Sequence, residues 1–408
     1  MKIAILVWDL NITGGTQRQA LELALNLQKL GHTVDVYCYV YDKNKCYTTL
    51  CDALNIISVK PGAQLQKTKN VKGERLIIKK IINLLHGYKN IVREIFKSDS
   101  EITELKRFIE KYHPLDYYDI INVHDYQVYK ISRIVHHPHI IWMMNDIRRY
   151  PMEGGNILNR NLHNILQSIL VYKETKNISR IIVLDKRNQL LAKKTYGVNA
   201  TIIRSGVDLD MFLNTKLKRD YNHQIWTIFA SSVFFPYRRF EDLVDAIEIL
   251  VKKNITNISV TINGLPDYSY EYYLSIKERI NKKNLGKNIA IVTGMSESQL
   301  KEQYSKSDIF VFPNKNQTWG LAVFEAMLAG CACIVSKGAG AHEVLTDKEN
   351  AILVNPLSPL EIAAAIEALI KNPLEMRRVS ENGSLFVREN LSWGKYTSQM
   401  LSVFKNEI

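Results

Sequence analysis

The first forty residues constrain the fold most, because they contain one complete β-α-β unit. The apolar run at 2–8 predicts a buried strand, and a glycine-containing turn follows it. The amphipathic stretch RQALELALNLQKL (18–30) then predicts a helix that ends at Gly31, before a second apolar strand at 33–40. A strand, a helix and a second strand in this order begin a doubly wound sheet of the Rossmann type.

The same alternation begins again near residue 225. Apolar runs such as IWTIFAS (225–231) and DIFVFPN (308–314) alternate with amphipathic stretches such as RFEDLVDAIEILVKK (239–253). A chain of 408 residues also has room for two cores. We therefore predict an α/β protein with two Rossmann-like, doubly wound domains that face each other across a cleft. Ligands are expected there, at the carboxyl ends of the strands.

Three segments follow from this pattern. We place the first domain at 1–210 and the second at 211–385, joined through SGVDLDMFLNTKLKRD (205–220). The last segment, 386–408, is expected to form a helix that packs back toward the first domain.

The composition describes a globular protein and argues against a membrane span. Hydrophobic residues make up 46% of the chain and charged residues 23%. No stretch approaches the ~20 consecutive apolar residues of a transmembrane helix. The five cysteines show neither CxxC spacing nor a disulfide framework, which fits reduced thiols in a cytoplasm.

Positive charge is concentrated in one segment. The chain has a formal net charge of +13, and residues 60–97 carry ten Lys or Arg against two Glu. Within it, 72–97 predicts an amphipathic basic helix, which suits either docking on an anionic membrane or an ordinary basic surface. We do not expect a nucleic-acid partner, because no reader motif or basic-aromatic strand pattern accompanies the charge.

Two glycines, Gly14 and Gly15, lie between the first strand and the first helix. They let the backbone approach a ligand closely, with helix N–H groups directed at an anion, although a plain tight turn has the same sequence. The pattern is not G-x-G-x-x-G, and Asp35 falls inside the second strand rather than at its end. A dinucleotide site is therefore not predicted.

Arg238 and Arg239 follow a strand and precede a helix of the second domain. Guanidinium groups bind phosphate bidentately and neutralise charge on a leaving group. The alternative is a solvated helix start. Two arginines there oppose the helix dipole, which favours a bound anion.

A lone carboxylate, Glu325, lies in a short helix that runs from Gly320 to Ala329 and is preceded by Gln317. The first amides of this helix offer a second seat for phosphate. A partly buried carboxylate needs hydrogen-bond donors, and a vicinal sugar diol would supply them. A capping or salt-bridged glutamate is the alternative.

Several ordered motifs together resemble the retaining glycosyltransferases of family four, which have the GT-B fold. The likeness runs in order over nearly the whole chain and is weakest at about 45–115. The motifs are GGTQRQALELALNLQKLGHTVDVY (14–37), SGVDLDMF (205–212), FFPYRRFEDLVDAI (234–247) and NQTWGLAVFEAMLAGCACIVSKGAGAHEVLTDKENAILVNPLSPLEIAAAI (316–366).

The resemblance implies roles for the residues of the second domain. The family's E-x7-E motif falls on Gln317 and Glu325, so Glu325 would hold the ribose of a nucleotide donor. Gln317 stands where the family has an acid that contacts the transferred sugar. Of the family's basic residues on the diphosphate, the first position here is near Val233, which leaves Arg238 and Arg239 to supply the charge.

Further donor-side positions follow from the same resemblance. Asn145 occupies the place of a histidine that helps to hold the donor sugar, and the loop of Gly14 and Gly15 would approach the diphosphate and the acceptor. The remaining donor-binding candidates are Gly294, Met295, Trp319, Gly320 and Leu321.

His124 and Asp125 end a strand of the first domain and are candidates for the acceptor side. A satisfied structural hydrogen bond is the alternative for such a histidine. The triplet DLD (208–210) imitates a metal-binding D-x-D but lies in the interdomain motif, so we expect no metal and no cofactor beyond the nucleotide sugar.

The resemblance implies a retaining, metal-independent transferase of the hexosyltransferase type. It would move sugar from a nucleotide-sugar donor to a glycan or lipid-linked acceptor during synthesis of cell-surface polysaccharide or glycoconjugate. We expect a cytoplasmic protein, peripheral on the inner face of the plasma membrane. Two alternatives stay open: a nucleotide-sugar epimerase or hydrolase on the same fold, and a catalytically weak carbohydrate-binding subunit.

Overall fold

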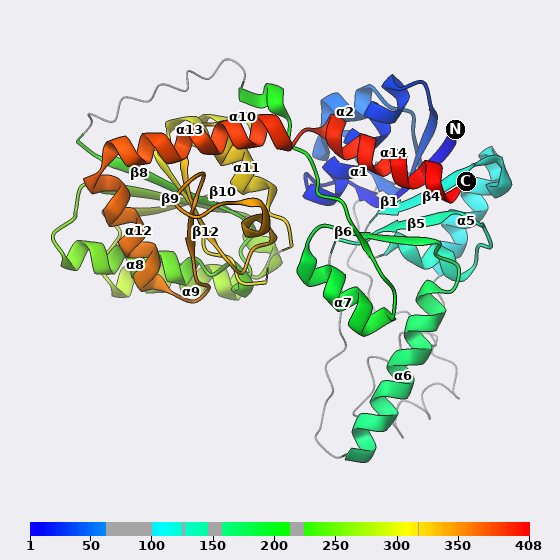
Figure 1. The fold of residues 1–408 in the computed structure, drawn as a ribbon, viewed down its shortest axis with the longest axis horizontal. Helices are drawn as coiled ribbons and strands as arrows, with labels where there is room; N and C mark the ends of the chain where they lie inside the picture. The colour runs from blue at the N-terminus through cyan, green and yellow to red at the C-terminus, as the bar shows by residue number, and fades with distance from the viewer. Residues whose placement is uncertain (63–99, 125–126, 146–156, 213–223, 317) are drawn as a thin grey trace. The chain divides into compact units, whose positions relative to one another are not determined.

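The computed structural model describes residues 1–62, 100–124, 127–145, 157–212, 224–316 and 318–408 (Figure 1). The basic segment 72–97, Asp125 and Gln317 lie outside the described residues. The chain divides into two compact units. Unit 1 is Met1–Ile203 with Tyr396–Ile408, and unit 2 is Arg204–Lys395.

Unit 1 contains, within its described residues, a parallel sheet of seven strands in the order β3-β2-β1-β4-β5-β6-β7. Its direction of winding reverses between β1 and β4. The strands are β1 (Lys2–Leu10), β2 (Thr33–Tyr41), β3 (Ile56–Pro61), β4 (Ile120–His124), β5 (Ile140–Met143), β6 (Arg180–Val183) and β7 (Thr201–Ile202).

Continuous apolar runs explain this sheet, because strands covered by helices on both faces have no polar side. In β1, the side chains of Ile3 to Val7 are at most 1% exposed, and in β5 Trp142 stacks on Tyr129 with ring centroids 4.1 Å apart. The described helices of unit 1 are α1 (Gly15–Lys29), α2 (Thr48–Asp52), α5 (Ser100–Tyr112), α6 (Ile157–Thr175), α7 (Lys186–Tyr196) and most of α14 (Trp393–Glu407).

Unit 2 contains a parallel sheet of six strands among its described residues, in the order β10-β9-β8-β11-β12-β13. The strands are β8 (Trp226–Ser231), β9 (Ile258–Gly264), β10 (Ile289–Thr293), β11 (Ile309–Phe312), β12 (Ala332–Ser336) and β13 (Ile352–Val354). The prediction of two doubly wound, Rossmann-like sheets is confirmed.

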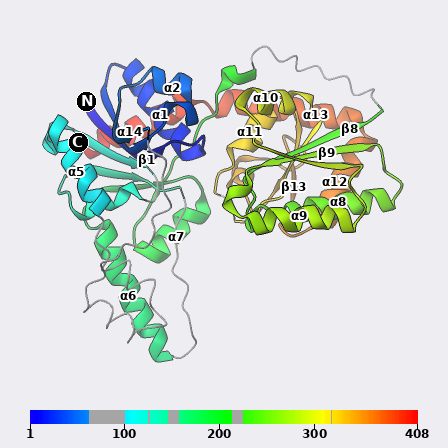
Figure 2. The ribbon, with the colours of Figure 1, turned by 180° about the vertical axis from the view of Figure 1, so that it is seen from behind.

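Helices cover both faces of the unit 2 sheet. Figures 1 and 2 show α8 and α9 on one face and α11 and α13 on the other. The described helices are α8 (Phe240–Lys252), α9 (Tyr270–Lys282), α10 (Glu297–Lys306), α11 (Leu321–Leu328), α12 (Pro359–Lys371) and α13 (Pro373–Asn390). No helix among the described residues is long and apolar enough to cross a membrane. All five cysteines are buried and free.

The segment that opens unit 2 packs directly on the segment that closes it. The amide of Val207 donates to the carbonyl of Leu391 at 3.2 Å, and Val207 forms a β-bridge with Ser392. A Cβ added to Gly206 would overlap the backbone of Ser392 and Trp393. Gly206 is therefore required for this close approach.

We predict that Gly206→Ala lowers the free energy of unfolding by about 1–3 kcal/mol, because backbone atoms cannot move aside as a flexible side chain would. Gly286→Ala is the matched control, since a Cβ at Gly286 meets nothing within 4 Å. Urea denaturation of the two variants measures the difference, and equal midpoints would contradict the prediction.

Candidate functional site

Three loops meet at the carboxyl edge of the unit 2 sheet. The loop after β8 and the loop after β11 are joined by the amide of Lys315, which donates to the carbonyl of Tyr237 at 2.7 Å. The loop after β12 packs closely on the loop after β11, since a Cβ at Gly338 would lie 2.7 Å from the carbonyl oxygen of Asn314. This edge is where open α/β sheets bind ligands.

Asn314 holds Arg238 at this edge. Its fully buried amide accepts a hydrogen bond from Nη1 of Arg238 at 3.0 Å and donates one to the Arg238 carbonyl at 3.0 Å. The guanidinium also lies 4.7 Å from the centre of the Tyr237 ring. Burial lowers the pKa of Arg238 from its usual value. An arginine guanidinium stays protonated in proteins. The structure thus places a partly buried guanidinium at the carboxyl edge of the sheet.

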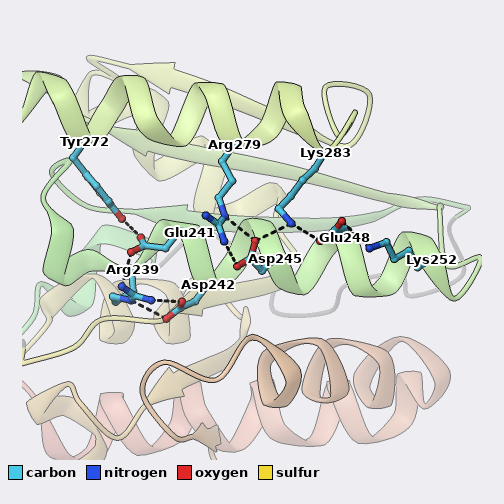
Figure 3. A network of polar contacts seen from close by, with 9 residues as sticks. All are labelled: Arg239, Glu241, Asp242, Asp245, Glu248, Lys252, Tyr272, Arg279 and Lys283. Carbon is cyan, nitrogen blue, oxygen red and sulfur yellow. Dashed lines mark hydrogen bonds and ion pairs between the residues drawn. The ribbon is translucent and has the colours of Figure 1, made fainter.

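Arg239 has different surroundings from its neighbour. It forms ion pairs with Glu241 and Asp242, both at 2.6 Å, at the start of α8 (Figure 3). The hydrogen bond to Asp242 raises the pKa of Arg239. These two carboxylates, rather than a bound anion, offset the unfavourable cation at the helix N-terminus. The two arginines expected to act together on a diphosphate are therefore held by different partners.

Glu325 is half-buried in α11 and accepts a hydrogen bond from the hydroxyl of Tyr304 at 3.3 Å. Tyr304 is fully buried, and burial raises its pKa, so it remains a donor. The helix begins after Gly320, whose φ is +97°. A Cβ there would lie 2.9 Å from the Phe312 ring, so Gly320 fits both the turn and the close packing.

Trp319 is buried just before α11. Its ring lies 4.6 Å from that of Phe324 and 5.7 Å from the guanidinium carbon of Arg204. Arg204 also forms an ion pair with Glu343 at 2.8 Å. Leu321 follows as a half-buried residue. The start of α11 is thus fixed by packing on several sides.

Gly294 and Met295 lie in the loop after β10, the outer strand of the same sheet. Gly294 is exposed with a φ of +71°, and Met295 is half-buried. The structure places both at the carboxyl edge, with β9 and β8 between them and the loop that carries Asn314.

In unit 1, polar side chains gather beside the glycine turn. The amide of Asn145, two residues after β5, donates to the hydroxyl of Thr16 at 2.7 Å. Gln17 donates to the carboxyl group of Asp9 at 2.5 Å, and its side chain lies so close to Gly14 that a Cβ there would overlap it. Burial raises the pKa of Asp9. The Gly14–Gly15 turn therefore brings together the ends of β1 and β5.

Asp9, Gln17 and Asn314 are site candidates that the sequence reasoning missed. For Asp9 a signal existed, because an acid near the end of an otherwise apolar strand points to the ligand-binding edge. Nothing in the spacing of residues indicates the contact of Asn314 with Arg238.

His124 ends β4 and is completely buried. Its Nε2 shares a hydrogen bond with the Asn122 amide oxygen at 2.7 Å, and its Nδ1 has no partner among the described residues. Burial lowers the pKa of His124 to about 3, so the ring is neutral at physiological pH. The structural hydrogen bond considered for this residue is present.

No group of three or more His, Cys, Asp or Glu that could hold a metal ion occurs in the part of the chain that the structure describes. Of the acids in the DLD triplet, Asp208 accepts the backbone amide of Asp210 at 3.0 Å in a local turn.

Comparison with known proteins covers both units. Residues 13–211 match the family model described as Glycosyltransferase Family 4, and residues 215–386 match the one described as Glycosyl transferases group 1. The mannosylfructose-phosphate synthase of Agrobacterium fabrum is 19% identical over 96% of this chain and 86% of its own. The phosphatidyl-myo-inositol mannosyltransferase of Mycobacterium tuberculosis is 26% identical over 59% of this chain and 63% of its own.

Two solved structures show the same fold over both units. Anabaena Alr3699/HepE in complex with UDP and glucose has a TM-score of 0.73 at 13% identity and covers 100% of both chains. WaaG, a glycosyltransferase involved in lipopolysaccharide biosynthesis, has a TM-score of 0.67 at 13% identity and covers 98% of this chain and 99% of its own.

We predict that His124 makes the stability of the protein fall in mild acid. The native ring stays neutral down to a pKa of about 3, whereas the unfolded ring gains its proton near 6.5. The unfolded state therefore binds more protons between these values, and the free energy of unfolding decreases as the pH falls from 6.5 toward 3.

Urea denaturation followed by tryptophan fluorescence tests this. Between about pH 7 and about pH 5, the free energy of unfolding of the native protein should fall by up to about 2 kcal/mol more than that of His124→Asn. His136→Asn, at an exposed histidine of the same unit, is the control and should lose as much as the native protein. Equal losses for the native protein and His124→Asn would contradict the prediction.

Proposed function

The chain belongs to glycosyltransferase family four, and from this premise we propose that it transfers a hexose, with retention, to a glycan or lipid-linked acceptor. As a member of that family it is a glycosyltransferase that takes sugar from a nucleotide-sugar donor. The product would be a cell-surface polysaccharide or glycoconjugate.

The observation that supports the donor site best is the contact between Arg238 and Asn314. It fixes a cation at the carboxyl edge of the sheet, against the loop that leads from β11 to α11. A guanidinium and helix amides are the groups that stabilise charge on a departing diphosphate. We assign Arg238 to the diphosphate, together with the amides that follow Gly320.

Glu325 would bind the ribose hydroxyls of the donor. Its carboxylate is half-buried and accepts a hydrogen bond from the Tyr304 hydroxyl. The two oxygens of a carboxylate suit the two hydroxyls of a vicinal diol. Gly294 and Met295 at the loop after β10 would contact the base. Gln317 would contact the transferred sugar, and as an amide it both donates and accepts.

Unit 1 would contribute side chains that bind the transferred sugar and the acceptor. Asn145 is held by Thr16 beside the glycine turn, in the position that the family resemblance gives to a donor-sugar contact. Asp9 adds a carboxyl group that Gln17 positions at the end of β1, where it can accept a hydrogen bond from an acceptor hydroxyl. Asp125, which follows the fully buried His124 in the chain, is the other proposed acceptor-side residue.

The reaction would proceed on one face of the sugar. The bond from the anomeric carbon to the diphosphate oxygen breaks, the acceptor hydroxyl bonds to that carbon, and its proton passes to the departing diphosphate. The contribution of the protein is orientation, together with stabilisation of the leaving group by Arg238.

A donor panel tests the function. Thermal shift and turnover are measured with UDP-, GDP-, ADP- and dTDP-sugars, since ligand binding raises the melting temperature by mass action. The UDP complex of the structural neighbour makes the uridine donors the first to try. Altered sugar or free nucleotide formed without any acceptor would instead mark an epimerase or hydrolase.

Two substitutions test the site. We expect Arg238→Gln to lower kcat/KM by about 10²–10³-fold, as loss of a charge-stabilising donor does, and Glu325→Ala to raise the donor KM by at least about tenfold. Glu381→Ala, at an exposed glutamate of α13, is the control and should leave both unchanged. Full activity of Glu325→Ala would refute the ribose assignment.

We also propose that the basic segment 72–97 docks on the inner, anionic face of the plasma membrane to reach a lipid-linked acceptor. Its net positive charge and amphipathic pattern support this. Reversing Lys79, Lys89 and Arg93 to Glu should abolish co-sedimentation with phosphatidylserine liposomes.

Reversing the exposed Lys277, Lys287 and Lys301 of unit 2 changes the net charge equally and is the control. Undiminished liposome binding after the changes in 72–97 would refute the membrane proposal.

A further inference from the structure

Arg239 occupies an unusual backbone conformation for a residue with a side chain. Its φ of +57° and ψ of +37° lie in the left-handed region, at the residue that separates Arg238 from α8. A side chain makes this conformation sterically unfavourable, so other contacts must hold it.

The side chain supplies these contacts by turning back onto α8. Nε and Nη2 of Arg239 bind both carboxylate oxygens of Asp242, at 3.0 and 2.6 Å, and Nη1 pairs with Glu241 at 2.6 Å. Asp242 is only 2% exposed, and Arg239 is the partner that the structure gives its carboxylate. Turning Arg239 toward a ligand would therefore leave a buried charge without compensation.

A second helix fixes the same turn from the other side. The hydroxyl of Tyr272 in α9 donates a hydrogen bond to Glu241 (Figure 3). The same hydroxyl accepts a hydrogen bond from the backbone amide of Phe240 at 2.9 Å. Figure 3 also shows that this network continues along α8 and α9. Its further pairs are Arg279 with Asp245, Lys283 with Asp245 and Glu248, and Lys252 with Glu248.

We infer that Arg239, clamped by Asp242, Glu241 and Tyr272, is a positioning residue that sets the turn carrying Arg238 and does not itself contact the donor. Arg238 is thus held from two directions. Asn314 fixes its guanidinium and its carbonyl, and the clamp fixes the backbone that follows it. This inference rests on the proposed function, in which Arg238 binds the diphosphate.

The two possible roles of Arg239 predict opposite effects of Asp242→Asn. If Arg239 bound the diphosphate, weakening its carboxylate partner would free its charge and tighten binding. If it positions Arg238, the same change loosens the turn and weakens binding. A positioning role also acts only through Arg238, so it disappears when Arg238 is absent, whereas two direct ligands contribute independently.

Calorimetric titration with UDP, GDP, ADP and dTDP measures this in a double-mutant cycle. We expect Asp242→Asn to weaken binding of the preferred diphosphate about tenfold in the native protein, and less than about twofold in Arg238→Gln. Tyr272→Phe leaves the Arg239 ion pairs in place. It should also weaken diphosphate binding more in the native protein than in Arg238→Gln, but by a smaller factor than Asp242→Asn. This second variant tests the proposal if Asp242→Asn does not fold.

Tighter binding by Asp242→Asn, or an equal loss in both backgrounds, would overturn the positioning role while leaving the proposed function intact. Failure of the native protein to bind any of the four diphosphates would overturn the proposed function, and the positioning role with it.

Discussion

The contact between Arg238 and Asn314 is the interaction on which the candidate donor site depends. It joins the loops that follow β8 and β11, which are adjacent strands of the sheet but distant in the sequence. Because the amide contacts both the guanidinium and the backbone carbonyl, it fixes the side chain and the turn together. The amide is neutral, so this contact does not offset the positive charge of the guanidinium.

The two arginines show how neighbouring residues acquire different tasks. Arg238 is held by a neutral partner, and Arg239 is held by two carboxylates of its own helix. Unit 1 has a comparable division. Asp9 is held by a neutral amide at the end of β1, while His124 is enclosed within the sheet and stays uncharged. In both units, an ionisable side chain at the edge of the sheet is held by a neutral amide.

Much of the fold could be predicted from sequence, because parallel strands buried on both faces leave uninterrupted apolar runs that alternate with helical patterns. The short helix that carries Glu325 could be predicted too, since the expected range of 320–329 agrees with α11 (Leu321–Leu328). The different surroundings of Arg239 could not be predicted. They depend on a left-handed backbone conformation at a residue that is not glycine and has no glycine beside it. Asn314 was missed because its role arises only when two loops meet in three dimensions.

The packing of Gly206 on Ser392 and Trp393 has a consequence for how the protein can evolve by exchange of segments. The chain enters unit 2 at Arg204 and leaves it after Lys395, and these two passages lie side by side. Unit 2 is therefore one continuous segment inserted into unit 1, and the two ends of this segment are adjacent. Exchange of residues 204–395 as one block between relatives would require two chain junctions at a single place in space and would leave the strands of the unit 1 sheet intact.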